Sequence, residues 1–142
     1  QANSILAFAD THAWRGFTLE ENIPAYPRWR IPLFHYLVGL SDYHNRGCLW
    51  LQPGIVYALA LNKVGETEPA KKVFGRIADH IGAHNGAYEV YERDGRPLKR
   101  LLYQSEHPFA WSSGLFLYAY HHIVQARSIG ISKRNAIKNR IT

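Results

Sequence analysis

The segment LQPGIVYALALNKVGETEPAKKVFGRIADHIG, residues 51–82, decides the fold class. Its second half places apolar side chains three and four residues apart, with two lysines and an arginine on the opposite side of the same helix. Thr67 is the expected N-cap of that helix. The first half is apolar, tolerates Pro53 in its first turn and stops at Gly65. Two helices joined by a short link predict an antiparallel helical hairpin and an all-α fold.

The rest of the chain predicts further helices, separated by loops. The pattern of residues 2–14 predicts one helix that ends near Thr11, and the apolar stretch from Ala110 predicts another. Three prolines within residues 21–36 favour an ordered loop, because proline blocks a continuous helix. An Asp-Gly pair at 94–95 is a strong turn signal and predicts a short β-hairpin excursion within residues 87–103.

The composition is that of an ordinary globular domain. At 142 residues the chain has the length of one domain, which buries roughly two thirds of its unfolded surface. It has no run of eighteen apolar residues and no signal-peptide pattern, so we expect neither a membrane span nor secretion. Cys48 is the only cysteine, which excludes an internal disulfide and favours a reducing compartment. A cytoplasmic location is therefore expected.

The positive charge is concentrated at one end of the chain. Residues 127–142 carry five basic side chains and no acidic one, whereas the remaining 126 residues hold 12 basic and 11 acidic ones. Because the body is close to neutral, we expect a solvated basic tail and not a nucleic-acid-binding arm. The sequence has no Met, even at position 1, so we expect a processed chain or a piece of a longer one.

The loops contain the mixture of side chains that carbohydrate sites use. Flat aromatic rings cover the apolar faces of a sugar, while amide, carboxylate and imidazole groups bind its hydroxyls. Glu89 stands between Tyr88 and Tyr91, whose hydroxyls can aim its carboxylate. A carboxylate held in this way can activate water as a general base. The other loop residues of this kind are Tyr43, His44, Asn45, Trp50, Glu106, His107, Phe109 and Trp111.

Two segments resemble motifs of one enzyme superfamily. DYHNRGCLWLQPGIVYALALNKVG, residues 42–65, is similar to the Tyr-His-Asn-Gly-x-x-Trp-Pro segment of glycogen-debranching-type amylo-α-1,6-glucosidases. YEVYERDGRPL (88–98), followed by HPFAWSSGLFLYAY (107–120), resembles their Glu-x-Tyr-Asp-x-x-x-Gly and Phe-x-Trp-(Ser/Thr)-x-Gly motifs. Similar motif pairs occur in trehalases, neutral invertases and processing α-glucosidases, which together are the six-hairpin glycosidases. The resemblance, which spans roughly residues 40–125, implies part of an (α/α)6 toroid.

The resemblance also implies roles for the matching positions. Glu89 falls on the general base that activates water in an inverting hydrolysis, here expected to be α-glucosidic. We expect its carboxylate to face a sugar-sized hollow between the His44–Trp50 loop and the helix entrance at Trp111. The sequence departs from the motifs at Arg46, Leu51 and Glu92, which replace Gly, Pro and Asp. The expected substrate-binding residues are Tyr43, His44, Asn45, Trp50, Tyr91, Glu106, Phe109 and Trp111.

An inverting glycosidase also needs a second carboxyl group, the general acid, roughly 6.5–9.5 Å from the base. In the resembled families this acid precedes both motifs, and Asp10, Glu20 and Glu21 lack its context. We therefore expect residues 1–126 to be the C-terminal portion of a catalytic domain, inactive alone, followed by the basic tail. The expected partners are a glucoside or oligosaccharide, and either the remainder of the domain or a second copy meeting exposed apolar helix faces.

Two other interpretations stay open at this level. A sugar epimerase with the same toroid would move protons with histidines such as His44 and His107, although the Glu-x-Tyr motif argues against it. A non-catalytic helical module would bind carbohydrate or protein without turnover. No cofactor is expected, because no Gly-rich phosphate loop occurs. His80 and His84 have metal-ligand spacing but lack a third ligand, so no metal is expected either.

Overall fold

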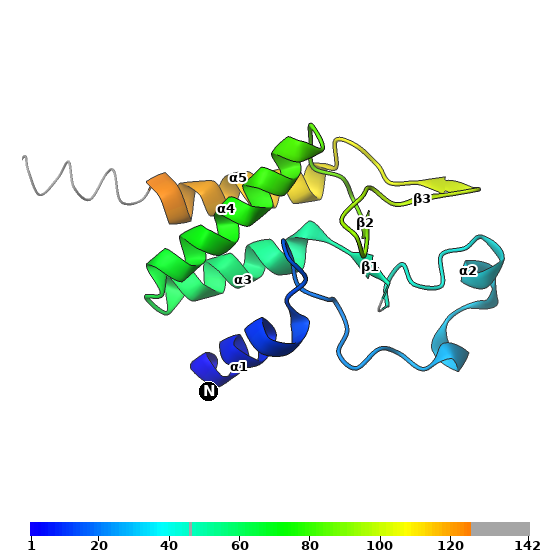
Figure 1. Cartoon of the computed structure of the whole chain (residues 1–142), viewed down its shortest axis with the longest axis horizontal. Coiled ribbons are helices and arrows are strands. Elements are labelled where there is room, and N and C mark those ends of the chain that lie inside the picture. Colours follow the sequence, from blue (N-terminus) through cyan, green and yellow to red (C-terminus); the bar gives the residue numbers. More distant parts are fainter. Residues whose placement is uncertain (46, 126–142) are drawn as a thin grey trace, which may run out of the picture.

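The computed structural model describes residues 1–45 and 47–125, and the basic tail expected at 127–142 lies outside them. The protein is mostly helical, with α3, α4 and α5 side by side at one end and α2 and β3 at the other (Figure 1). The elements are α1 (Ala2–Phe8), π-helix η1 (Ala9–Ala13), 3-10 helix η2 (Arg28–Arg30), α2 (Leu33–Leu37), β1 (Cys48–Leu49), α3 (Leu51–Lys63), α4 (Thr67–Ala83), β2 (Tyr91–Glu92), β3 (Lys99–Arg100), β4 (Tyr103–Gln104), α5 (Ala110–Tyr120) and π-helix η3 (His121–Gln125). The all-α class with short β-hairpins is confirmed.

The predicted hairpin of α3 and α4 is confirmed, and it forms the centre of the core. Ile55 and Ile77 are fully buried between the two helices, and each such side chain stabilises the fold by about 1.5–3 kcal/mol. The link turns at Gly65, whose φ of 93° suits glycine. The expectation that Thr67 caps α4 was wrong. Glu66 is the N-cap and Thr67 is the first helical residue, and the Thr67 hydroxyl donates to the Gly65 carbonyl instead of capping the helix.

A buried threonine from a distant loop fixes the start of α3. The Thr18 hydroxyl donates to the Trp50 carbonyl at 2.6 Å and accepts the Gly54 N–H at 3.0 Å. Gly54 lies in the first turn of α3, and its N–H and the Trp50 carbonyl four residues before it both bond to this one hydroxyl. Only glycine fits there, since an added Cβ would lie 2.7 Å from the Thr18 hydroxyl oxygen. The loop that precedes α2 is thereby attached to the central hairpin.

The short strands pair differently from the predicted single hairpin. β2 pairs antiparallel with β1, which lies 43 residues earlier, and β3 pairs with β4. The turn at Asp94–Gly95 does form, because the Gly95 N–H donates to the Glu92 carbonyl and Tyr91 bridges to Pro97. β1 directly precedes α3 and β2 follows α4, so the α3–α4 hairpin brings the two strands together. The predicted loop at 21–36 also contains the short helices η2 and α2, neither of which buries a residue.

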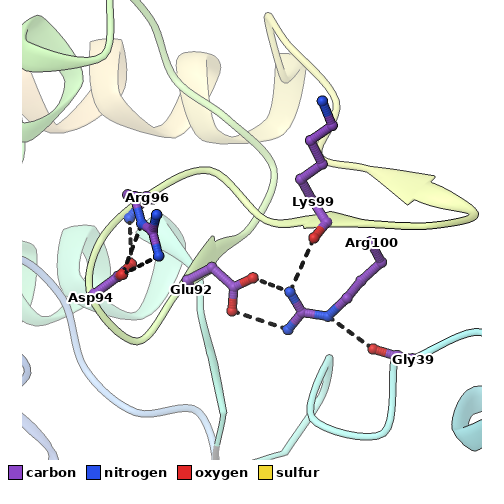
Figure 2. A network of polar contacts seen from close by, with 6 residues as sticks. All are labelled: Gly39, Glu92, Asp94, Arg96, Lys99 and Arg100. Carbon is purple, nitrogen blue, oxygen red and sulfur yellow. Dashed lines mark hydrogen bonds and ion pairs between the residues drawn. The ribbon is translucent and has the colours of Figure 1, made fainter.

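Arg100 links these strands to the loop after α2 (Figure 2). Its guanidinium forms an ion pair with both carboxylate oxygens of Glu92, and its Nε donates to the Gly39 carbonyl at 3.0 Å. A two-point contact of this kind fixes orientation as well as distance. It joins β3, β2 and the loop after α2 at one place, close to the strands that carry the candidate site.

Many apolar side chains remain on the surface, as expected for faces without a partner. α5 and η3 contain no charged residue, and a helix that is apolar all round normally lies inside a larger core. Here only one side of α5 is covered, and Trp111 and Leu117 are 66% and 58% exposed. Within residues 1–45 and 47–125, no helix combines the length and hydrophobicity that a membrane crossing needs.

Candidate functional site

The Glu89 carboxylate is held by two tyrosine hydroxyls from different parts of the chain. Tyr43 donates to Oε1 at 2.7 Å, and Tyr103 donates to Oε2 in a short hydrogen bond. The two hydroxyl oxygens are themselves 3.2 Å apart. Tyr43 comes from the loop before β1, and Tyr103 is the first residue of β4. We call these three residues, Tyr43, Glu89 and Tyr103, the carboxylate clamp.

Both tyrosines stay protonated over the physiological range. Burial, and next the hydrogen bond to Glu89, raise the pKa of the Tyr43 hydroxyl well above its usual value. The same two causes, in the same order, raise the pKa of the Tyr103 hydroxyl. Each hydroxyl is therefore a neutral donor, and each donates to the Glu89 carboxylate. The clamp sets the position of the carboxylate without adding a charge.

The backbone around Glu89 is fixed by the segment that follows β4. The Glu89 N–H donates to the Glu106 carbonyl at 3.0 Å, and the Val90 N–H donates to the Ser105 hydroxyl at 2.9 Å. Ser105 is buried, and its own N–H donates to the Leu98 carbonyl. Both ends of the excursion at 87–103 thus meet behind Glu89. The side chain of Glu106 is exposed, so its contribution here comes from its backbone.

An aromatic cluster supports the clamp from one side. The Trp50 indole N–H donates to the Tyr43 carbonyl at 3.0 Å, and the two rings meet edge to face with centroids 5.0 Å apart. His44 stacks on Trp50 at 5.0 Å and 10°. Trp50 is buried, so it supports Tyr43 and His44 and does not present a free face. Phe109 lies in the same apolar cluster.

Other expected site residues have structural roles or lie elsewhere. The Asn45 amide is buried and holds Tyr26 through two hydrogen bonds to its backbone. Tyr91 was expected to line the pocket, but its ring is 0% exposed, since it packs against Phe17 and His80. Burial raises its pKa to about 12. Side chains two residues apart share a face only within a regular strand. β2 begins at Tyr91, so Glu89 lies outside the strand and its side chain need not point to the same side as that of Tyr91.

Trp111 does not join the clamp. It opens α5, as the sequence predicts, but its side chain points largely into solvent and belongs to neither apolar cluster. Of the two sides expected for the hollow, the one at the His44–Trp50 loop is present, through Tyr43. Trp111 does not form the other side. A cavity of about 530 Å³ lies between α1, α3 and α4, and its wall does not include Glu89.

Sequence reasoning missed Tyr103. Its segment, LKRLLYQ (98–104), shows no motif, and it is brought to Glu89 by the turn at Leu101 and Leu102 that pairs β3 with β4. A tyrosine that follows a predicted hairpin turn is the only signal that could have indicated it. That signal alone does not indicate which residue the tyrosine contacts.

The residues with metal-binding or nucleophilic potential are packed in the core. His80 stacks on Phe17 at 3.6 Å, and burial, then the neighbouring His84, lower its pKa to about 4. Cys48 is 1% exposed, and burial raises the pKa of its thiol to about 12. Among the residues that the structure describes, no group of three or more His, Cys, Asp or Glu side chains could hold a metal ion.

Comparison with protein-family models, with curated proteins and with solved structures finds no match for this chain. The carboxylate clamp is therefore the basis for a functional assignment.

Proposed function

We propose that Glu89 is the general base of an inverting glycoside hydrolase and that this chain is part of an (α/α)6 toroid. The single observation that carries the proposal is the carboxylate clamp. A general base must be held within hydrogen-bond reach of a water molecule and aimed at it. Tyr43 and Tyr103 hold the carboxylate from two directions. A carboxylate has about four lone-pair positions, so two remain to accept a proton from water.

The surroundings of the clamp support a carbohydrate substrate. Aromatic rings and an imidazole lie beside Tyr43, in the combination that binds the apolar faces and hydroxyls of a sugar. His44 is the exposed member of this cluster and is the side chain we assign to substrate contact. The other acidic residue nearby in sequence, Glu92, is already paired with Arg100. This difference in pairing is why the base is assigned to Glu89.

The reaction needs a second carboxyl group as general acid. We assign it to a polypeptide segment other than these 142 residues, so this chain alone is expected to be inactive. The same assignment accounts for the exposed apolar side of α5, which a neighbouring helix of the toroid would cover. An α-glucosidic substrate, glucoside or oligosaccharide, follows from the motif resemblance.

The test is glucose release from α-1,4- and α-1,6-linked glucosides by the full-length polypeptide that contains these residues. Glu89→Gln should lower kcat by about 10²–10⁴, the usual contribution of general base catalysis. Proton NMR of the first product should show the β-anomer, as inversion requires. The matched control is Glu92→Gln, which should lose its ion pair with Arg100 but keep turnover. Unchanged turnover by Glu89→Gln would rule out the assignment.

One observation favours a second candidate, carbohydrate binding without turnover. Both oxygens of Glu89 already accept a tyrosine hydroxyl, as in a polar network that serves only structure. In that case the full-length protein would bind a glucoside and release no glucose from any linkage. Glu89→Gln would then weaken binding or stability, and there would be no turnover to lose.

A further inference from the structure

A second concave site lies in the loop region beside the carboxylate clamp, and the hydrolase proposal uses only one of its residues, His44. It is a cavity of about 190 Å³ between η2, α2 and the loop after α2. Its polar wall is made by Tyr26, Arg30, His35, Ser41, His44 and Asn45, and an isoleucine and a proline complete it. Only His44 also belongs to the aromatic cluster beside the carboxylate clamp.

Hydrogen bonds within the loop hold this wall in place. The Asn45 amide closes the loop by accepting the Tyr26 N–H at 2.8 Å and donating to the Tyr26 carbonyl at 3.3 Å. The His35 carbonyl accepts the Leu40 N–H at 2.7 Å, and the Asn22 side chain donates to the His44 carbonyl at 2.8 Å. A wall fixed in this way loses little conformational entropy when a ligand binds.

The charge of the wall favours an anion. Arg30 carries a permanent positive charge, and its guanidinium lies over the Trp29 ring, 5.1 Å from the centroid. Two imidazoles and a serine hydroxyl add hydrogen-bond groups, and no carboxylate is among the lining residues. Glu21 lies outside that wall, with its Oε2 3.5 Å from the Nδ1 of His44. A planar guanidinium matches carboxylate and phosphate oxygens in geometry and charge.

The volume limits the ligand to one small ring. At about 190 Å³, the cavity is smaller than the ~300–1,000 Å³ of sites for drug-sized ligands. Tyr26, together with the isoleucine and the proline, gives one apolar side, on which the C–H face of a ring can lie.

We infer that this cavity binds a single sugar ring bearing a carboxylate or a phosphate, with Arg30 on the anionic group. His35 and Ser41 bind ring hydroxyls, and His44 lies at the end nearest the carboxylate clamp. The inference goes beyond the proposed hydrolysis, since it concerns binding alone and assigns no role to Glu89.

The test is calorimetric titration of the protein with glucuronate, glucose 6-phosphate, glucose and inorganic phosphate. An anionic sugar should bind at least about tenfold more tightly than glucose, and raising NaCl from about 50 to about 500 mM should weaken it. The glucuronate and glucose 6-phosphate arms show which anionic group is preferred. Arg30→Gln should remove the preference over glucose. Arg28→Gln, on the same short helix but outside the wall, is the matched control and should keep it.

Three results would overturn the inference. Equal affinity for glucose and both anionic sugars, or no binding of any of them, would exclude an anionic sugar site. Equal losses in Arg30→Gln and Arg28→Gln would show attraction to a general positive surface. Inorganic phosphate that binds as tightly as the sugar phosphate would remove the sugar ring from the assignment. Since none of these measurements depends on turnover, failure of this inference is distinguishable from failure of the hydrolase proposal.

Discussion

The Tyr43 hydroxyl donates a 2.7 Å hydrogen bond to Oε1 of Glu89, across 46 residues of sequence. The Tyr103 hydroxyl, 14 residues after Glu89, donates to the other carboxylate oxygen. This closes a contact between two loop segments and β4.

Removing either hydroxyl should destabilise the protein. Tyr43→Phe and Tyr103→Phe should each lower the free energy of unfolding by about 1–2 kcal/mol, since each deletes a partly buried hydrogen bond to a carboxylate. The double variant should lose less than the sum of the two, with a coupling of about 0.5–2 kcal/mol. Urea unfolding followed by circular dichroism measures this. Tyr36→Phe, which removes an exposed hydrogen bond to the Arg28 carbonyl, should have little effect. Strict additivity would contradict the clamp.

The contact between Gly54 and Thr18 should not tolerate a methyl group. Gly54→Ala should destabilise the protein by about 1–3 kcal/mol, because the new Cβ would lie 2.7 Å from the Thr18 hydroxyl oxygen and 2.9 Å from its Cα. Gly75→Ala is the control, since that helical position is open and alanine should stabilise it by about 0.5–1 kcal/mol. Thermal unfolding of both variants gives the comparison. A neutral Gly54→Ala would show that the loop does not sit against α3 in this way.

The half-buried His80 should make stability depend on pH. Its pKa is lowered from 6.5 to about 4, first by burial and then by His84, so the unfolded chain binds a proton that the folded one rejects. Its contribution is fully present above about pH 6.5 and is lost as the pH falls towards 4. After allowance for the partial exposure of the ring, the loss is about 1–2 kcal/mol. The free energy of unfolding, measured with urea at several pH values across this range, should change less with pH in His80→Phe than in the parent protein. His121→Gln, an exposed histidine, should keep the full pH dependence.

The single thiol should be unreactive in the folded protein. Cys48 is buried under Trp50, Val90 and Leu98, and burial raises its pKa to about 12, so little thiolate forms at neutral pH. Reaction with a thiol reagent should be slow without denaturant and complete in urea. Fast reaction of the folded protein would mean that the β1–β2 pairing opens readily.

The exposed apolar side of α5 should promote association. Replacing both Trp111 and Leu117 with Gln should reduce concentration-dependent self-association of the isolated chain, measured by sedimentation. Val64→Gln, a less exposed apolar position at the α3–α4 link, is the control and should leave it unchanged. Equal association of the double variant and the parent would place the contact on another surface.

The sequence alone determined the helical hairpin and the loops around it. Apolar spacing along α4, Pro53 in the first turn of α3 and the stop at Gly65 act within a few residues, so their effect can be predicted without tertiary contacts. The position of Glu89 in a loop excursion followed in the same way, from the turn at 94–95 and the helix that starts at Ala110.

Only the tertiary structure decided what surrounds Glu89. Tyr103 became its partner through the turn that pairs β3 with β4, and Tyr91 became a core residue where β2 pairs with the distant β1. That pairing sets which side of the segment faces inward, since shifting a strand by one residue turns every side chain to the other face. Hydrogen bonds between residues 14 and 46 positions apart leave no periodic trace in the sequence. They depend on the α3–α4 hairpin, which brings those loops together.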